Sequence, residues 1–476
     1  MSQAITIPQQ AIGKYRWTIC GLLFFATTVN YLDRQVLSLL QPTLAERYNW
    51  TNNDYANITS VFQFMYAISM LFAGRIIDKL GTKAGYTWAI IIWSLGALLH
   101  AAAIPIGNAF NTIVGLAGIS AFSVSIVGFM IGRIVLALGE AGNFPAAIKA
   151  TAEYFPRKER SFATGIFNSG ANVGAILAPL TVPWIEVNWG WEAAFIVVGG
   201  IGFLWLLFWI FMYETPEKQK RLSAEELSYI NSDKDENPVS KAVLKEAGPD
   251  PAAAVGPVPA VGGKVSWVKL LGFKQTWAFV FGKFMTDGVW WFFLFWLPAY
   301  LKAQYGMEKT EIMLPIAVLY SMTMFGSIGG GWFPVHYMKK GLHAYDARMK
   351  AMFVIALIPL VVLAAQPLGG ISYWMPVLLI GIGASAHQAW SANIFTTVSD
   401  MFPKKAIGSV IGIGGMAGGI GGVVVSKTGG ALFDHYKALG HIQTGYTIMF
   451  SFCAVAYIIA WMVMKALVPR MKFVEI

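Results

Sequence analysis

The chain contains 476 residues, of which 56% are hydrophobic and only 13% are charged, and its mean hydropathy is +0.56. Because soluble domains carry roughly a quarter charged residues, this composition excludes an ordinary soluble protein and indicates a membrane protein with many spans. The formal net charge of +10 does not indicate nucleic-acid binding, because the basic residues are scattered over many short loops instead of clustering on one face.

Apolar segments long enough to cross a bilayer, which takes about 20 residues, occur about twelve times, in two sets. The first set lies near residues 17–40, 55–77, 84–104, 119–147, 161–184 and 191–213. The second set lies near residues 274–301, 311–335, 349–366, 371–398, 406–431 and 445–467. We therefore predict an all-α membrane protein with about twelve transmembrane helices in two six-helix bundles, residues 1–213 and 273–476, joined by a cytoplasmic linker at 214–272.

Lys and Arg are divided unevenly between the two sides of these spans. One side collects most of them, including those near both chain ends and the stretch from Lys218 to Lys274, whereas the opposite loops hold few. Since short loops rich in Lys and Arg stay in the cytoplasm, we expect both termini to be cytoplasmic. Residues 1–13 form a short polar stretch without the features of a signal peptide.

Charged side chains also fall inside the apolar spans, where an unpaired charge costs several kcal/mol. Asp33 and Arg34 lie in the first span, and Arg133 and Glu140 lie seven residues apart on one face of the fourth. Asp33 and Glu140 are the candidate proton carriers, whereas an arginine stays charged and is suited to holding a carboxylate. The alternative is that the carboxylates only neutralise the arginines and lock helices together. Lys149, near the end of its helix, either contacts substrate or extends to the interface.

Paired motifs suggest that the two halves are related. Phe155-Pro156 and Phe402-Pro403 each precede basic residues and a glycine-rich helix, as expected of parallel repeats, and we expect these glycines to allow close helix packing. In the linker, Ser223 and Glu226 predict the start of a short helix near 222–231. The composition of residues 248–257 predicts a disordered connection.

The seventh span combines a charge pair with aromatic residues. Lys283 and Asp287 are four residues apart and are expected to pair along one helix face. The same span carries Trp290 and Trp291 among further aromatic residues. Some of this aromatic surface is expected to line a cavity and stack on a sugar-like ring, and an interfacial aromatic belt explains part of it.

The tenth span carries a polar cluster among Gly and Ala. Its candidate cavity-lining residues are His387, Gln388, Trp390 and Asn393. These side chains offer several groups that recognise hydroxyls within two helical turns. The alternative for His387 is that it is a satisfied structural histidine.

The stretch Gly74-Arg75-Ile76-Ile77-Asp78-Lys79-Leu80-Gly81-Thr82-Lys83, after the second span, resembles the cytoplasmic signature loop of the major facilitator superfamily. The resemblance extends over the whole chain apart from the central loop. It implies that Asp78, Lys79 and Lys83 latch the two halves together in the outward-open state. The matching loop after the eighth span, residues 331–340, lacks the aspartate.

Within that superfamily, the chain resembles the anion:cation symporters for sugar acids, which include hexuronate and galactonate carriers. Three stretches carry this resemblance: Asn30-Tyr31-Leu32-Asp33-Arg34, Arg133 with Glu140, and Phe155-Pro156-Arg157-Lys158-Glu159-Arg160. It implies a monomeric, multi-pass protein of the cell inner membrane, with Asp33 and Glu140 as protonation sites. Arg133, together with Arg34, would lie near the substrate carboxylate, and Tyr31 and Tyr66 would line the cavity.

Two classes of function remain to be compared. The first is a proton symporter that imports hexuronates such as glucuronate and galacturonate; an aldonate such as galactonate, or a dicarboxylate, is the alternative cargo. The second is a multi-span membrane enzyme or sensor that uses His387 or Lys283 chemically. We expect no enzyme, because no catalytic triad, metal-ligand spacing or phosphate-binding glycine loop is found. Cys20 and Cys453 lie within spans and provide no disulfide or metal framework, so no cofactor is expected.

Overall fold

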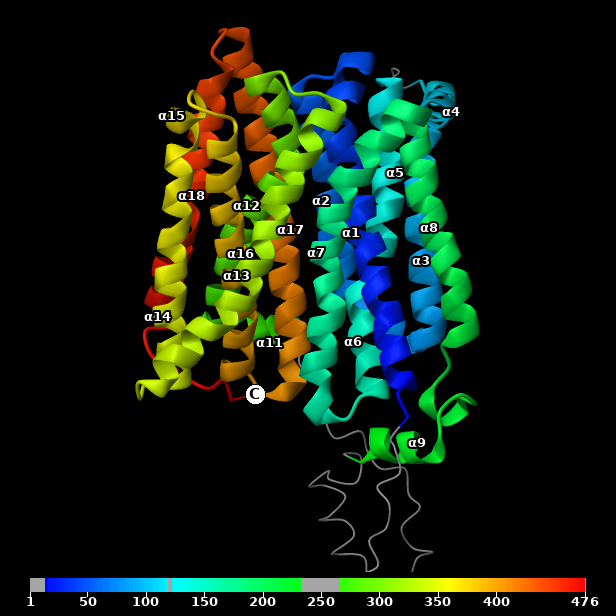
Figure 1. The fold of residues 1–476 in the computed structure, drawn as a ribbon, viewed down its shortest axis with the longest axis vertical. Coiled ribbons are helices and arrows are strands. Elements are labelled where there is room, and N and C mark those ends of the chain that lie inside the picture. Colours follow the sequence, from blue (N-terminus) through cyan, green and yellow to red (C-terminus); the bar gives the residue numbers. More distant parts are fainter. Residues whose placement is uncertain (1–12, 119–121, 233–265, 476) are drawn as a thin grey trace, which may run out of the picture.

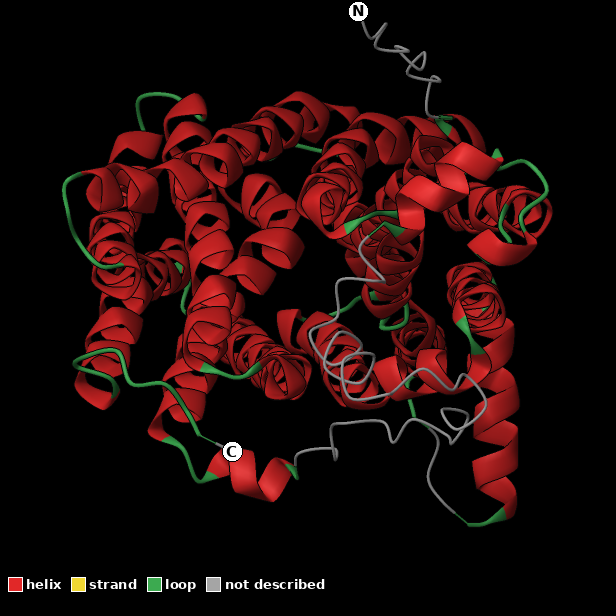
Figure 2. Cartoon of the chain, turned by 90° about the horizontal axis from the view of Figure 1, so that it is seen from below, coloured by secondary structure: helices red, strands yellow, loops and turns green. Residues whose placement is uncertain are grey.

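The computed structural model describes residues 13–118, 122–232 and 266–475, and every regular element in these ranges is a helix (Figures 1 and 2). The long helices lie side by side along the long axis of the molecule (Figure 1). The predicted disordered connection at 248–257 lies outside the described residues. The predicted all-α architecture is confirmed.

The helices form an earlier and a later group in the chain, here called the first and second groups. The first group consists of α1 (Tyr15–Tyr48), α2 (Asn52–Leu80), α3 (Thr82–Ala101), α4 (Ala103–Leu116), α5 (Val124–Glu140), α6 (Asn143–Tyr154), α7 (Arg157–Trp189) and α8 (Trp191–Met212). The second consists of α12 (Lys274–Tyr305), η2 (Lys309–Ile312), α13 (Met313–Lys339), α14 (Ala344–Leu357), η3 (Ile358–Ala364), α15 (Ala365–Gly369), α16 (Trp374–Met401), α17 (Lys404–Ala438) and α18 (Ile442–Leu467). Between them lie η1 (Pro216–Lys218), α9 (Ala224–Asn231) and α11 (Trp267–Leu271).

Ten helical segments in the described residues are long and apolar enough to cross a membrane. Helices α1 and α16, with 34 and 28 residues, are as long as the others but more polar, because they carry several candidate site residues. With these two helices the number of spans agrees with the predicted twelve. The boundaries at residues 213 and 273 remain a prediction.

The structure differs from the predicted spans in two places. Residues after the third span form α4, a 14-residue helix that the apolar segments did not include; at 1.5 Å per residue it is about 21 Å long, too short to cross a bilayer. In the ninth span, the 3₁₀ helix η3 interrupts the α-helix, and Pro359 lies at its start. A proline removes one backbone donor, which favours such a break.

Close packing of the glycine-rich helices is confirmed at α7. A Cβ atom added at Gly170 or Gly174 would lie 2.3 Å from the carbonyl oxygen of Phe24 or Thr28 in α1. The two Phe-Pro motifs also adopt the same geometry, since Pro156 and Pro403 both cap their helices with extended backbone (φ −63°, ψ 155° and φ −64°, ψ 149°).

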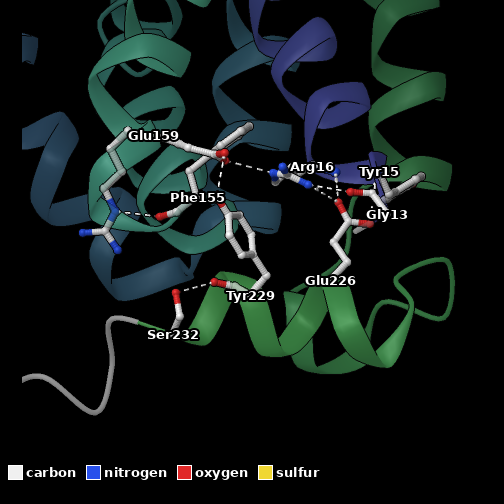
Figure 3. A network of polar contacts seen from close by, with 9 residues as sticks. Gly13, Tyr15, Arg16, Phe155, Glu159, Glu226, Tyr229 and Ser232 are labelled. Carbon is white, nitrogen blue, oxygen red and sulfur yellow. Dashed lines mark hydrogen bonds and ion pairs between the residues drawn. The ribbon is translucent and has the colours of Figure 1, made fainter. Parts of the chain in front are cut away.

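Helix α9 is fastened to the first group (Figure 3). Ser223 caps it by accepting from the Glu226 amide, as predicted. The buried Glu226 carboxylate in turn accepts from the backbone N–H groups of Tyr15 and Arg16 at the start of α1, at 3.1 and 3.0 Å. The Arg16 guanidinium binds both Glu226 and Glu159 of α7, at 3.2 and 3.0 Å. A carboxylate at a helix N-terminus is stabilising, so α9 holds α1 and α7 together.

The two groups meet through α2 against α17, α7 against α13, and α1 against α12. Polar contacts join them at the end of the bundle opposite α9. The Asp434 carboxylate of α17 accepts from the backbone N–H groups of Asn52 and Asn53 of α2, at 2.8 and 2.7 Å. The Lys302 ammonium of α12 contacts Glu46 of α1 at 2.9 Å. These contacts close the interface at that end.

Candidate functional site

The centre of the bundle contains a buried ion pair between α1 and α5. The Arg34 Nε and Nη2 atoms both donate to Oε2 of Glu140, at 2.9 and 2.6 Å. The two side chains are 4% and 0% exposed. Because Arg133 and Glu140 share one face of α5, sequence analysis had grouped those two residues, but the hydrogen-bond partner of Glu140 comes from another helix.

Four aromatic rings surround the Arg34 guanidinium. Its Cζ atom lies 4.9 Å from the ring centroid of Tyr31, 4.8 Å from Tyr66, 5.6 Å from Phe62 and 5.2 Å from Trp291. A cation over an aromatic face is attracted by the ring quadrupole. Trp291 belongs to α12, whereas the other rings belong to α1 and α2, so the two helix groups build this site together. Tyr31 and Tyr66 are half-buried.

Arg133 is fully buried and incompletely bonded. Its Nη1 atom donates to the Arg34 carbonyl oxygen at 3.5 Å, and Nε and Nη2 have no hydrogen-bond partner among the described residues. The rings of Phe62 and Phe295 lie 5.1 and 5.8 Å from its Cζ atom. A buried guanidinium with two unused donors is costly, which marks Arg133 as a group that is able to bind an anion.

Asp33 is 3% exposed, and both of its carboxylate oxygens lack a partner within the part of the chain that the structure describes. Neighbouring residues of an α-helix point about 100° apart, so the side chains of Asp33 and Arg34 face different surroundings. Arg133 and Glu140 lie within electrostatic reach of Asp33. The site thus combines one satisfied ion pair with one unsatisfied acid and one incompletely bonded arginine.

The candidate residues of the second group separate into several locations. His387 of α16 stacks on Trp290 with ring centroids 4.9 Å apart, and its Nδ1 atom lies 2.8 Å from the Tyr457 hydroxyl of α18. The Trp390 ring packs edge-on against Tyr457 at 5.6 Å. Asn393 donates to the Gly330 carbonyl oxygen of α13 at 2.7 Å. His387 therefore lies beside the seventh span, whereas Asn393 joins α16 to α13.

Of the remaining candidates, Gln388 is half-buried, and Lys149 lies away from the central charges. The Lys149 ammonium contacts the Asp78 carboxylate at 3.1 Å and the Ile77 carbonyl oxygen at 3.3 Å. It therefore lies beside the signature loop in this structure, and its substrate contact stays a prediction.

The signature loop contacts the first group and the segment that follows it. Asp78 pairs with Lys149, Lys79 is exposed, and Lys83 pairs with Glu214 after α8 at 2.7 Å. The hydrogen bond from Lys83 lowers the pKa of the Glu214 carboxyl below its usual value. The predicted latch between the two halves stays a prediction.

Sequence analysis did not single out Phe62, and it counted Phe295 only among the further aromatic residues of the seventh span, although both contact the central arginines. Phe62 of α2 lies against both Arg34 and Arg133. Phe295 lies against Arg133, and the Tyr55 hydroxyl donates to the Phe295 carbonyl oxygen at 2.7 Å. Phe62 precedes Tyr66 by one helical turn, so the helical spacing from a candidate residue was the available signal.

Two apolar surface grooves of about 380 and 440 Å³ run beside α2 and α13. Neither groove is lined by any of the four central charged residues, Asp33, Arg34, Arg133 and Glu140. In this conformation the central charges are enclosed by protein.

The known proteins to which this chain is similar are transporters. A family profile described as Major Facilitator Superfamily matches residues 23–426. The hexuronate transporter of Escherichia coli (strain K12) is 27% identical over 98% of this chain and 96% of its own length. A probable galactarate/D-glucarate transporter of the same strain is 29% identical over 88% of each chain. The crystal structure of a D-xylose-proton symporter superposes with a TM-score of 0.69 at 14% identity, covering 96% of this chain and 98% of that chain.

Proposed function

This chain belongs to the Major Facilitator Superfamily, and from that premise we propose that it imports hexuronates such as glucuronate and galacturonate together with a proton. It is an organic-anion transporter and not an enzyme. Under this proposal the protein lies in the cell inner membrane as a monomer, with both termini and the α9 end of the bundle in the cytoplasm.

One observation carries the proposal. In the buried centre, Arg133 has unused hydrogen-bond donors, and the nearby Asp33 carboxylate accepts no hydrogen bond from the described residues. A substrate carboxylate would bind Arg133 through Nε and Nη2, which have no partner among the described residues, because a guanidinium forms paired hydrogen bonds with a carboxylate. A proton on Asp33 would remove an unpaired buried charge. Arg34 is already matched by Glu140, and a proton on Glu140 would release that arginine for the same anion.

The contacts between the two groups suggest how access alternates. At the end opposite α9, Asp434 and Lys302 of the second group hold α2 and α1. At the α9 end, Asp78 pairs with Lys149 and Lys83 pairs with Glu214, and neither partner belongs to the second group. We infer that the structure is closed to the outside, and that the signature loop engages the second group when the outer end opens. Coupling requires that substrate and proton favour one of these states together.

The test is uptake of radiolabelled glucuronate into proteoliposomes that contain the purified protein, with and without an inward proton gradient. We expect accumulation above equilibrium only with the gradient. Asp33→Asn should lose this accumulation but keep exchange of internal for external substrate. The reason is that the substrate carboxylate binds Arg133 under this proposal, and Asp33 carries only the proton.

The matched control is Asp400→Asn, which changes another largely buried carboxylate, paired with Arg348 at 2.9 Å. It should retain gradient-driven accumulation. Accumulation by the unmodified protein that ignores the proton gradient would reject proton coupling, and the absence of any sugar-acid uptake would reject the substrate class.

A further inference from the structure

A single face of α12 extends the charged site toward the α9 end. Lys283, Asp287, Trp291 and Phe295 follow one another at intervals of four residues, so their side chains lie in one row. Trp291 and Phe295 contact the guanidinium groups of Arg34 and Arg133 in the first group. Lys283 and Asp287 therefore occupy the same row as two residues that touch the central arginines.

The Lys283–Asp287 pair has short contact distances but is not fully buried. The Lys283 ammonium contacts both carboxylate oxygens of Asp287, at 2.6 and 2.8 Å. The side chain of Lys283 is 6% exposed and that of Asp287 is 17% exposed, whereas that of Glu140 is 0% exposed. Asp287 is thus the most accessible carboxylate of the ion pairs near the centre.

The surroundings of the pair leave space for its carboxylate and connect it with the candidate site. A Cβ atom on Gly418 of α17 would lie 2.2 Å from Oδ2 of Asp287, so the carboxylate occupies the space that a side chain would take there. Tyr31 lies within electrostatic reach of both Arg34 and Asp287. His387 lies within such reach of Lys283, and Tyr457 of Asp287. The pair therefore lies near both the central site and the polar residues of α16 and α18.

We propose that Lys283 and Asp287 form a second subsite, which binds the hydroxylated end of a monocarboxylate sugar acid and excludes a second carboxylate. The inference rests on the proposed function and names the substrate class that the site selects. Asp287 and Trp291, whose ring lies against Arg34, are four positions apart, a rise of about 6 Å along the helix axis.

The chemistry of the pair explains the selection. The Asp287 oxygens accept hydrogen bonds from sugar hydroxyls, and the Lys283 ammonium donates to hydroxyl oxygens. A second carboxylate on the substrate would meet Asp287 as a like charge, while Lys283 is already neutralised. Specificity built on such repulsion is an established way to reject a close relative of the correct ligand.

Isothermal titration of the full-length protein in detergent tests this subsite with two ligands, D-glucuronate and D-glucarate, which differ in the oxidation of one terminal carbon. The unmodified protein should bind glucuronate at least tenfold more tightly. Asp287→Asn removes the repulsion and leaves Lys283 without its counter-charge, so the preference should shift toward glucarate by at least tenfold. A purely structural pair would leave this ratio unchanged.

Two further variants keep the result decisive. Lys283→Met with Asp287→Leu replaces the pair by apolar residues, which usually preserves folding, and it should weaken glucuronate binding at least tenfold. Asp400→Asn, in the Arg348–Asp400 pair of similar burial (11% and 19% exposed), should alter neither affinity. Equal losses for both ligands, or no change in the ratio, would overturn the subsite. Failure of the unmodified protein to bind either ligand would instead reject the proposed function.

Discussion

The centre of the helix interface and its ends use charged residues in opposite ways. At the ends, two carboxylates are matched by backbone donors: Asp434 accepts from the first amides of α2, and Glu226 accepts from the first amides of α1. At the centre, Asp33 and Arg133 keep several polar atoms without partners among the described residues. The same residue types therefore fasten helices where they are satisfied and remain available for a ligand where they are not.

The difference follows from what each location demands. A helix N-terminus offers a carboxylate several N–H donors at fixed positions, so an end contact forms without any ligand. A buried charge without partners is unstable on its own, and it becomes favourable only when another group supplies the missing hydrogen bonds. Removing central charges should accordingly change transport, whereas removing end charges should change local opening or stability.

The largest expected effect is at Arg133. Arg133→Ala removes the guanidinium with unused donors, and we expect glucuronate uptake in proteoliposomes to fall at least a hundredfold. Arg348→Ala, which removes a paired arginine outside the centre, should retain uptake per reconstituted molecule. The contrast between centre and ends would be broken if the two variants lost uptake equally.

A second central prediction concerns the Arg34–Glu140 pair. Glu140→Gln leaves a buried arginine without its counter-charge, which costs about 3–5 kcal/mol, so the melting temperature of the detergent-solubilised protein should fall clearly. Arg34→Met combined with Glu140→Leu should restore most of the stability but not the transport. Transport by this apolar variant would show that the pair serves only to lock helices.

At the end opposite α9, Asp434→Asn should open the interface locally. The variant weakens the charged cap on the first turn of α2, an effect of about 1 kcal/mol, so the amides of Asn52 and Asn53 should exchange faster in hydrogen-exchange mass spectrometry. Lys437→Gln, near the end of the same helix α17, is the control and should leave their exchange unchanged. Unchanged exchange in Asp434→Asn would mean that these amides are protected in another way.

The smallest effect is expected at the exposed Lys83–Glu214 pair. Its side chains are 36% and 37% exposed, so solvent screening limits its contribution to well under about 1 kcal/mol. Because the pKa of Glu214 is lowered in the folded protein, its contribution is present above the ordinary glutamate pKa and is lost as the pH falls through the lowered value. The stability difference between the unmodified protein and Glu214→Gln should thus be detectable at pH 7 and vanish under strong acid. A difference that persists in acid would exclude this ion pair as its cause.

Several parts of the fold could be predicted because they depend on local sequence. Ser223 as a helix cap and the two Phe-Pro motifs are short-range features, and the apolar spans follow from composition. Helix α4 was missed because its 14 residues are too few to stand out as a span. The η3 interruption depends on how the ninth span packs, and Pro359 alone does not specify it.

The candidate site could be predicted in its members but not in its pairings. Arg34, Glu140, Tyr31, Tyr66 and Trp291 were all identified from the sequence, and the structure brings them together. Residue spacing reports only which side chains share one helix face. It does not report that Glu140 would meet an arginine of α1, or that Lys149 would lie beside Asp78.

The sequence by itself determined that this chain crosses the membrane many times and places ionisable groups inside its spans, because hydropathy and charge are properties of short segments. Only the tertiary structure decided which of those groups are satisfied. Hydrogen bonds and ion pairs depend on distances of about 3 Å between helices far apart in the chain, and the packing of α1, α5 and α12 sets those distances.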